Sequence, residues 1–170
     1  SDGLPDGYEV ANNFDPNLDT GDDGASGDPD MDTLDNITEF GLGTNPNEED
    51  TDDDGYNDAV ENLSGVWFDA SATGSDPLNP DTDGDGLVDG VENPDLAFDA
   101  GNPTTQPGTD PNLRDSDSDG VSDRLEIENG TDPTNSASTP GPSSNVLSAD
   151  FQGIPGGAFT NEPVLMEGGS

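Results

Sequence analysis

The sequence predicts a mostly irregular fold: an elongated tandem array of loops with single helical turns and little regular secondary structure. The first reason is charge, because 40 acidic residues stand against two basic ones, Arg114 and Arg124, and the formal net charge is -38. The second is the apolar content. Leu, Ile, Val and Phe supply only 29 of the 170 residues, too few for a conventional core in so charged a chain. The third is an acidic pattern that recurs along the chain.

The composition also excludes several partners and chemistries. A chain without a basic stripe cannot neutralise phosphates, so we expect no nucleic acid partner. Anionic membrane surfaces would repel the chain, and no apolar run approaches the roughly 18 residues of a membrane span, so we expect no direct membrane insertion. Because the chain has no Cys and no His, disulfides, thiol nucleophiles and zinc sites are excluded as well.

A twelve-residue pattern occurs three times in full. It reads DTDDDGYNDAVE over 50–61, DTDGDGLVDGVE over 81–92 and DSDSDGVSDRLE over 115–126. Each copy has Asp at positions 1, 3, 5 and 9, Gly at 6 and Glu at 12. In calcium loops, side chains at 1, 3, 5, 9 and 12 and the carbonyl at 7 surround one ion, and Gly at 6 permits the sharp turn. The sequence therefore predicts several bound calcium ions.

The ligands predicted for the complete loops follow from these positions. For loop 50–61 they are Asp50, Asp52, Asp54, Tyr56, Asp58 and Glu61. For loop 81–92 they are Asp81, Asp83, Asp85, Leu87, Asp89 and Glu92. For loop 115–126 they are Asp115, Asp117, Asp119, Val121, Asp123 and Glu126.

Two further copies are imperfect. Loop 28–39, DPDMDTLDNITE, has Thr33 at the glycine position and Asn36 at position 9, and we expect it to bind more weakly. Loop 2–9, DGLPDGYE, matches only the second half of a copy, whose first half would precede Ser1 or lie on another molecule. The predicted ligands are Asp28, Asp30, Asp32, Leu34, Asn36 and Glu39 in the former and Asp2, Leu4, Asp6 and Glu9 in the latter.

A short turn accompanies the loops. The segments 43–46, 74–77 and 108–111 each read Gly, Ser or Thr, Asp or Asn, Pro, and each begins seven residues before a loop aspartate. Proline presets φ, and the preceding polar residues cap turns through side-chain hydrogen bonds, so turn and loop are expected to form one unit. A fourth turn, 130–133, has no loop after it, and the array should end there.

Apolar residues recur at positions 7 and 11, which are four apart and therefore lie on one face of a helical turn. We expect them to form small separate cores under the loops. The inserts 62–80 and 93–114, the first with Val66, Trp67 and Phe68, either cover these apolar faces or present a contact surface.

These loops and turns resemble thrombospondin type 3 repeats, in the cysteine-free form found in bacteria. The resemblance spans roughly residues 1–135 and implies an elongated, calcium-filled structure that serves adhesion, matrix assembly or spacing. Paired EF-hands and dockerins fit less well. Both need helices around the loops, whereas Pro46, Pro77, Pro80 and Pro111 precede the loops here.

Three regions are therefore expected: the repeat array over 1–135, a Ser, Thr, Pro and Gly-rich linker over 136–144, and a tail over 145–170. The tail contains short apolar runs that could form strands. It is too short to be a domain alone, so we expect it to dock on a neighbour or to begin a further domain.

We expect an extracellular calcium-binding structural protein, such as a rigid spacer, an adhesin segment or a filament subunit, that folds when calcium binds. Its partners would be other copies, through the termini, or components of the matrix or cell surface. The alternative is a non-catalytic accessory region of a secreted hydrolase. Catalysis within the chain is not expected, because the regularly spaced carboxylates are assigned to metal. Sequons at Asn36, Asn62 and Asn129 would permit glycosylation.

Overall fold

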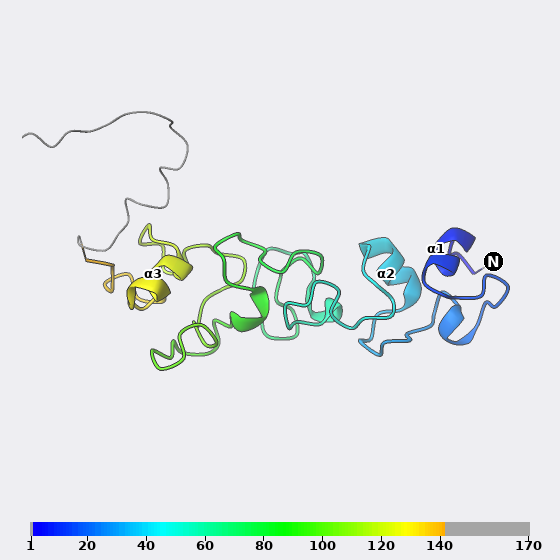
Figure 1. The fold of residues 1–170 in the computed structure, drawn as a ribbon, viewed down its shortest axis with the longest axis horizontal. Helices are drawn as coiled ribbons and strands as arrows, with labels where there is room; N and C mark the ends of the chain where they lie inside the picture. Colours follow the sequence, from blue (N-terminus) through cyan, green and yellow to red (C-terminus); the bar gives the residue numbers. More distant parts are fainter. Residues whose placement is uncertain (1, 142–170) are drawn as a thin grey trace, which may run out of the picture. The chain divides into compact units, whose positions relative to one another are not determined.

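The computed structural model describes residues 2–141, and residues 1–140 form one compact unit. The strands predicted for the tail over 145–170 lie outside the described residues. Within 2–141 the chain is mostly irregular, contains no sheet and has one isolated bridge, between Asp69 and Ala72, so the predicted fold class is confirmed. No helix in this part of the chain is both long and apolar enough to cross a bilayer. The helical elements (Figure 1) are α1 Asp6–Ala11, η1 Gly21–Asp23, α2 Asn36–Leu42, η2 Asp58–Val60, η3 Asp89–Val91 and α3 Asp123–Asn129.

The last part of every loop is a helical turn that begins at position 9. The starting residues are Asp6, Asn36, Asp58, Asp89 and Asp123. In the four longer loops the amide of position 9 donates to the carbonyl of the residue before position 1, at 2.9 to 3.2 Å, which closes the loop. Helices α2 and α3 then end at Gly43 and Gly130, both in the left-handed conformation that favours glycine. The helices are short because the turn begins there.

Hydrogen bonds join each turn to its loop. In the turns before the complete loops, the backbone N–H of the third residue donates to the hydroxyl at position 2 of the loop, for example from Asn45 to Thr51 Oγ1 at 2.8 Å. Thr51 Oγ1 in turn donates to Asp58 Oδ2 at 2.7 Å. The same relay runs from Asp110 through Ser116 to Asp123. Turn, loop and following helix are therefore one hydrogen-bonded unit.

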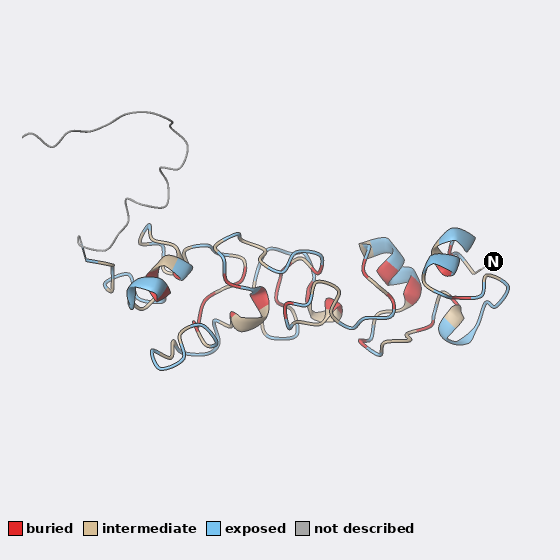
Figure 2. Cartoon of the chain, viewed as in Figure 1, coloured by how far each residue is buried: buried red, intermediate tan, exposed pale blue. Residues whose placement is uncertain are grey.

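The interior of this unit is acidic rather than apolar. Among the described residues, the buried hydrophobic side chains are only Leu4, Phe14, Leu87 and Ile127, and Figure 2 shows buried residues on the helical turns. By contrast, the position 12 glutamate is at most 3% exposed in all five loops. The predicted small cores form only in part, since Leu4 and Leu87 at position 7 are buried while the residues at position 11 are half-buried. The buried glutamates are Glu9, Glu39, Glu61, Glu92 and Glu126.

The first insert, residues 62–80, begins and ends beside loop 50–61. Leu63 N–H donates to the carbonyl of Ser75 at 3.0 Å, and Gly65 N–H donates to that of Gly74 at 2.9 Å, so the chain comes back beside the point where it left. Trp67 lies against Tyr56 of loop 50–61, with ring centroids 6.3 Å apart. This insert therefore covers part of an apolar face, although its Phe68 remains 80% exposed.

Consecutive loops pack directly on one another. Position 10 of one loop lies against positions 5 and 6 of the loop before it. Arg124 N–H donates to Asp85 Oδ2 at 2.9 Å, and Arg124 Nη1 donates to the carbonyl of Gly86 at 2.7 Å. At the previous junction the backbone of Gly90 lies so close to Asp54 that a Cβ on Gly90 would stand 2.3 Å from the Asp54 carbonyl oxygen. A side chain therefore does not fit at Gly90.

Gly90→Ala tests this junction. The added methyl would displace loop 81–92 from loop 50–61, and overpacking of this kind costs about 1 to 3 kcal/mol, so we expect a lower melting temperature in calcium. Gly7→Ala is the matched control, because Gly7 lies in a helical turn and a Cβ added there would have no neighbour within 4 Å. Equal melting temperatures for the two variants would contradict the packing described for Gly90.

Candidate metal centres

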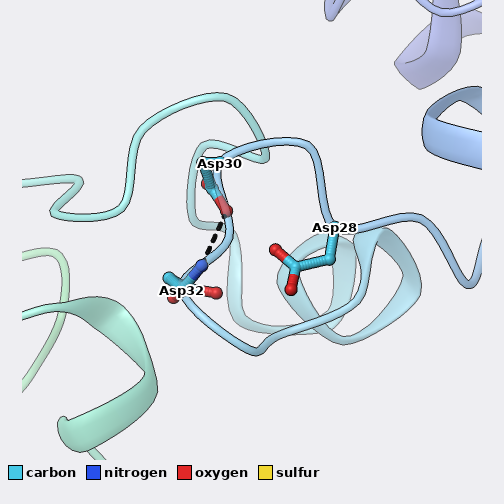
Figure 3. Close-up of side chains that lie close together, drawn as sticks. All are labelled: Asp28, Asp30 and Asp32. Carbon is cyan, nitrogen blue, oxygen red and sulfur yellow. Dashed lines mark hydrogen bonds between the residues drawn. The ribbon is translucent and has the colours of Figure 1, made fainter.

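Four loops gather the carboxylates of positions 1, 3 and 5. In each, one oxygen atom from each of the three side chains lies within 4.8 Å of the others. Figure 3 shows this for loop 28–39, where the three aspartates come from one bend of the chain and Asp32 N–H donates to Asp30 Oδ1 at 3.3 Å. The clusters are Asp28, Asp30 and Asp32; Asp50, Asp52 and Asp54; Asp81, Asp83 and Asp85; and Asp115, Asp117 and Asp119.

Hydrogen bonds from the backbone orient these carboxylates. Position 5 accepts from the amide of position 7 in every loop, at 2.7 Å in Asp32, Asp54 and Asp85. The same bond measures 2.9 Å in Asp119 and 3.2 Å in Asp2. At position 1 of the three complete loops, Oδ2 accepts from the amide of the position 6 glycine. Such local turns need only nearby residues, and they hold the side chains in place while leaving lone pairs free.

The position 12 glutamates are buried in all five loops. Burial, followed by the charges of Asp30 and Asp32, raises the pKa of Glu39 to about 8. Burial raises the pKa of Glu92 to about 9, although a hydrogen bond from Thr109 opposes the shift. That bond, from Thr109 Oγ1 to Glu92 Oε1, measures 2.9 Å. The hydroxyl residue of the turn thus positions the glutamate of the loop before it.

The aspartates of the clusters are perturbed in the same direction. Burial raises the pKa of Asp54 to about 7 and that of Asp83 to about 7, and neighbouring aspartates add to both shifts. No basic side chain relieves this repulsion within the clusters of the described residues: Arg124 forms its ion pair with Glu128, at 2.9 Å, on the surface. The sites therefore need a cation or protons, because burying an uncompensated carboxylate costs several kcal/mol.

The donor set fits calcium. Both carboxylate oxygens of Glu39, and Oδ2 of Asp54, Asp83 and Asp119, are buried and have no hydrogen-bond partner. Orphaned buried oxygens are costly, whereas calcium takes six to eight oxygen ligands, many from carboxylates. The structure brings together the predicted aspartates at positions 1, 3 and 5 of the longer loops, and Glu61 at position 12 joins a cluster with Asp54. The ligand roles predicted for these residues stay predictions.

The side chain at position 9 makes contacts that the sequence analysis did not predict. Its carboxylate accepts hydrogen bonds from position 2 of its own loop, as when Ser116 N–H and Ser116 Oγ donate to Asp123 at 3.0 and 2.7 Å. At one junction position 9 also meets carboxylates of the preceding loop. Asp89 joins Asp54 and Glu61 in a cluster of oxygens within 4.8 Å. The signal for the first role was present in the sequence, because position 2 is Thr or Ser in all complete loops.

The imperfect loops differ from the complete ones. Asn36 is fully buried, and its Nδ2 donates to the carbonyls of Asp22 and Gly24, at 2.8 Å each. These bonds leave no access for a glycan at the Asn36 sequon in the folded protein. In loop 2–9, Asp2 accepts backbone hydrogen bonds on both oxygens and Asp6 is exposed. Of the predicted side-chain ligands there, only Glu9 is buried.

Comparison with known proteins agrees with these loops. The family described as the bacterial TSP3 repeat matches residues 50–65, 81–93 and 115–136. The matched segments contain the three complete loops, while loops 2–9 and 28–39 lie outside them. No curated protein and no solved structure matches the chain significantly. The predicted resemblance is confirmed over these three segments, and the acidic clusters fit calcium-binding repeats.

Thr33→Gly should strengthen loop 28–39. Thr33 stands at the glycine position with φ 91°, a conformation that costs a residue with a side chain about 1 to 2 kcal/mol. We expect the variant to melt higher in calcium, with a net gain of about 1 kcal/mol after the greater entropy of unfolded glycine. The reverse change, Gly55→Thr at φ 108°, should destabilise. A loss of stability in Thr33→Gly would show that this conformation is not strained.

Stability should depend on pH in opposite ways with and without calcium. Without metal, folded Glu39 and Glu92 have raised pKa values of about 8 and about 9, so the folded chain binds more protons than the unfolded chain. Raising the pH from about 5 to about 9 should therefore remove stability. In calcium, stability should instead increase between about pH 5 and about pH 7, because protons compete with the ion.

Urea unfolding followed by Trp67 fluorescence, in chelator and in calcium, measures both dependences. If the free energy of unfolding in chelator increased with pH, Glu39 and Glu92 would not be buried without a counter-ion, as the structure shows them.

Proposed function

Because three segments of this chain are bacterial TSP3 repeats, we propose that it is an extracellular structural protein, a spacer whose loops become rigid as they bind calcium. The burial of the position 12 glutamates carries this proposal. Glu39, Glu92 and Glu126 are fully buried, at the places where an ordinary domain would have an apolar core. A chain built in this way has a reason to fold only when cations are present.

Calcium can supply the missing stability. An ion present at a hundredfold excess over its Kd contributes about 2.7 kcal/mol at each site. The three complete loops together would contribute roughly 8 kcal/mol, which is comparable to the stability of an ordinary domain, about 5 to 15 kcal/mol. Calcium loops of extracellular modules have Kd values of roughly 0.1 to 1 mM. Such sites would fill outside the cell and stay empty in the cytosol.

The contacts between loops support a spacer rather than a sensor. Each of the two later complete loops packs on the loop before it through position 10, as Arg124 does on Gly86. Tyr56 adds a further contact, because its hydroxyl donates to the carbonyl of Glu92 at 2.6 Å. In an array of nearest-neighbour contacts, ions that order each unit also order the junctions. No reaction is proposed for the chain, and the partners proposed are other copies or extracellular surfaces.

At about pH 9, where protons no longer neutralise the buried glutamates, removal of calcium should unfold the chain. With chelator, we expect the helical signal in circular dichroism to fall and the radius of gyration to increase toward about 40 Å, the value for an unfolded chain of this length. Calcium should restore both. Magnesium at equal ionic strength is the control for screening, and we expect it to restore less because it demands a small octahedral site. Unchanged scattering and circular dichroism in chelator would contradict the coupling of folding to calcium.

A further inference from the structure

One acidic side chain lies in the site of another loop. Asp89 is position 9 of loop 81–92 and begins η3 Asp89–Val91. An oxygen of its carboxylate nevertheless lies within 4.8 Å of carboxylate oxygens of Asp54 and Glu61, which are positions 5 and 12 of loop 50–61. The junction at Gly90, whose Cβ position would stand 2.3 Å from the Asp54 carbonyl oxygen, brings the two loops this close.

Asp89 also differs from the other aspartates at position 9. In Asp58 and Asp123 both carboxylate oxygens accept hydrogen bonds from position 2 of the same loop. In Asp89, Oδ1 accepts from Thr82 N–H at 2.9 Å and the Thr82 side chain also lies close to the carboxylate, while Oδ2 is buried and has no partner in hydrogen-bond geometry. The residue is fully buried, with 0% of its surface exposed. Asp89 is therefore a fully buried residue that has one carboxylate oxygen near two other carboxylates and one oxygen without a hydrogen-bond partner.

A bound cation accounts for this arrangement when the three carboxyl groups are ionised. Asp54 is 7% exposed and Glu61 is 2% exposed, so water cannot screen three negative groups at this separation. No basic side chain joins the cluster in the described part of the chain, where the ion pair of Arg124 is with Glu128. Like charges placed together in a buried site repel strongly, and an orphaned oxygen adds a desolvation cost. A hard divalent cation removes both penalties.

We propose that Asp89 is a calcium ligand of the preceding loop, so that the ion of loop 50–61 is shared by two consecutive repeats. This inference rests on the proposed calcium function. Asp54 and Glu61 come from one repeat and Asp89 Oδ2 from the next. The site is therefore complete only when loop 81–92 is docked. By linkage, the ion and the docked junction must stabilise each other.

Trp67 provides a probe for this one site. It is the only tryptophan of the chain, and its ring lies 6.3 Å from that of Tyr56 in loop 50–61. Terbium(III) binds oxygen-rich calcium sites and emits when a nearby excited indole transfers energy to it. Selective excitation of tryptophan during a terbium titration therefore reports on loop 50–61 above the other loops, and competition by calcium measures calcium binding there.

The decisive variant is Asp89→Asn. It keeps an oxygen that can accept from Thr82 N–H but removes the charge. We expect half-saturation of the Trp67-sensitised signal to need at least about tenfold more terbium than in the wild type, as expected for the loss of a charged ligand. Asp123→Asn is the matched control: the same change at the same position of the next loop, away from Asp54, should leave the Trp67 titration close to that of the wild type.

A structural role for Asp89 makes a different prediction. If Asp89 only held Thr82, then Asp89→Asn would keep the wild-type midpoint, because the amide oxygen of Asn still accepts from the backbone N–H of Thr82. A shifted midpoint in Asp89→Asn therefore argues against a purely structural role. Circular dichroism at saturating calcium checks that the variants fold. If Asp89→Asn does not fold, Asp89→Glu and Asp89→Gln are compared, since they share a length and differ in charge, and tighter terbium binding by the Glu variant supports the proposal.

The outcomes distinguish calcium binding by loop 50–61 from the role of Asp89 as a ligand. Absence of any Trp67-sensitised, calcium-displaceable signal in the wild-type chain would remove the proposed function at this loop. A wild-type signal whose midpoint is unchanged in Asp89→Asn would overturn the shared site and leave calcium binding by loop 50–61 intact. A shift in Asp89→Asn that Asp123→Asn does not reproduce would establish Asp89 as a ligand of the preceding loop.

Discussion

Buried carboxylates without basic partners are the constraint on which this structure depends. In all five loops the glutamate at position 12 is at most 3% exposed, in a chain with two basic residues. Desolvating an unpaired carboxylate costs several kcal/mol, and four buried hydrophobic side chains among the described residues cannot offset five of them. The interior therefore consists largely of carboxylate oxygens that need a cation, whereas the interior of most domains consists of apolar contacts.

The surrounding structure serves to hold those oxygens. Amide hydrogens of the loop backbone fix the aspartates at positions 1 and 5, as in the bonds from Gly86 to Asp81 and from Leu87 to Asp85. The turn hydroxyl of Thr109 fixes Glu92 from outside the loop. The inserts fit this scheme, because the chain that leaves after Glu61 returns at Ser75 through backbone hydrogen bonds. Loop length between the units can therefore vary while the site geometry stays constant.

Contacts between units give the array its continuity. Position 10 of one loop approaches positions 5 and 6 of the preceding loop, closely enough at Gly90 that only glycine fits, and with two hydrogen bonds at Arg124. The glycine at position 6 of these loops is there for its positive φ, whereas the glycine at position 10 of loop 81–92 leaves room for the loop before it. Units linked in this way resemble other repeat proteins, in which each repeat is stabilised chiefly by its neighbours.

The sequence by itself determined the irregular fold class, the loops, the clusters of aspartates at positions 1, 3 and 5 and the presence of single helical turns. These features depend on hydrogen bonds within one turn and its loop, so the spacing of Asp and Gly suffices to predict them. Only the tertiary structure decided that Asp89 faces Asp54, that Trp67 covers Tyr56 and that Asn36 is buried against Gly24. Such contacts join different repeats or inserts, as in the Arg124 to Asp85 bond across 39 residues. A local acidic pattern carries no information about which neighbour it will meet.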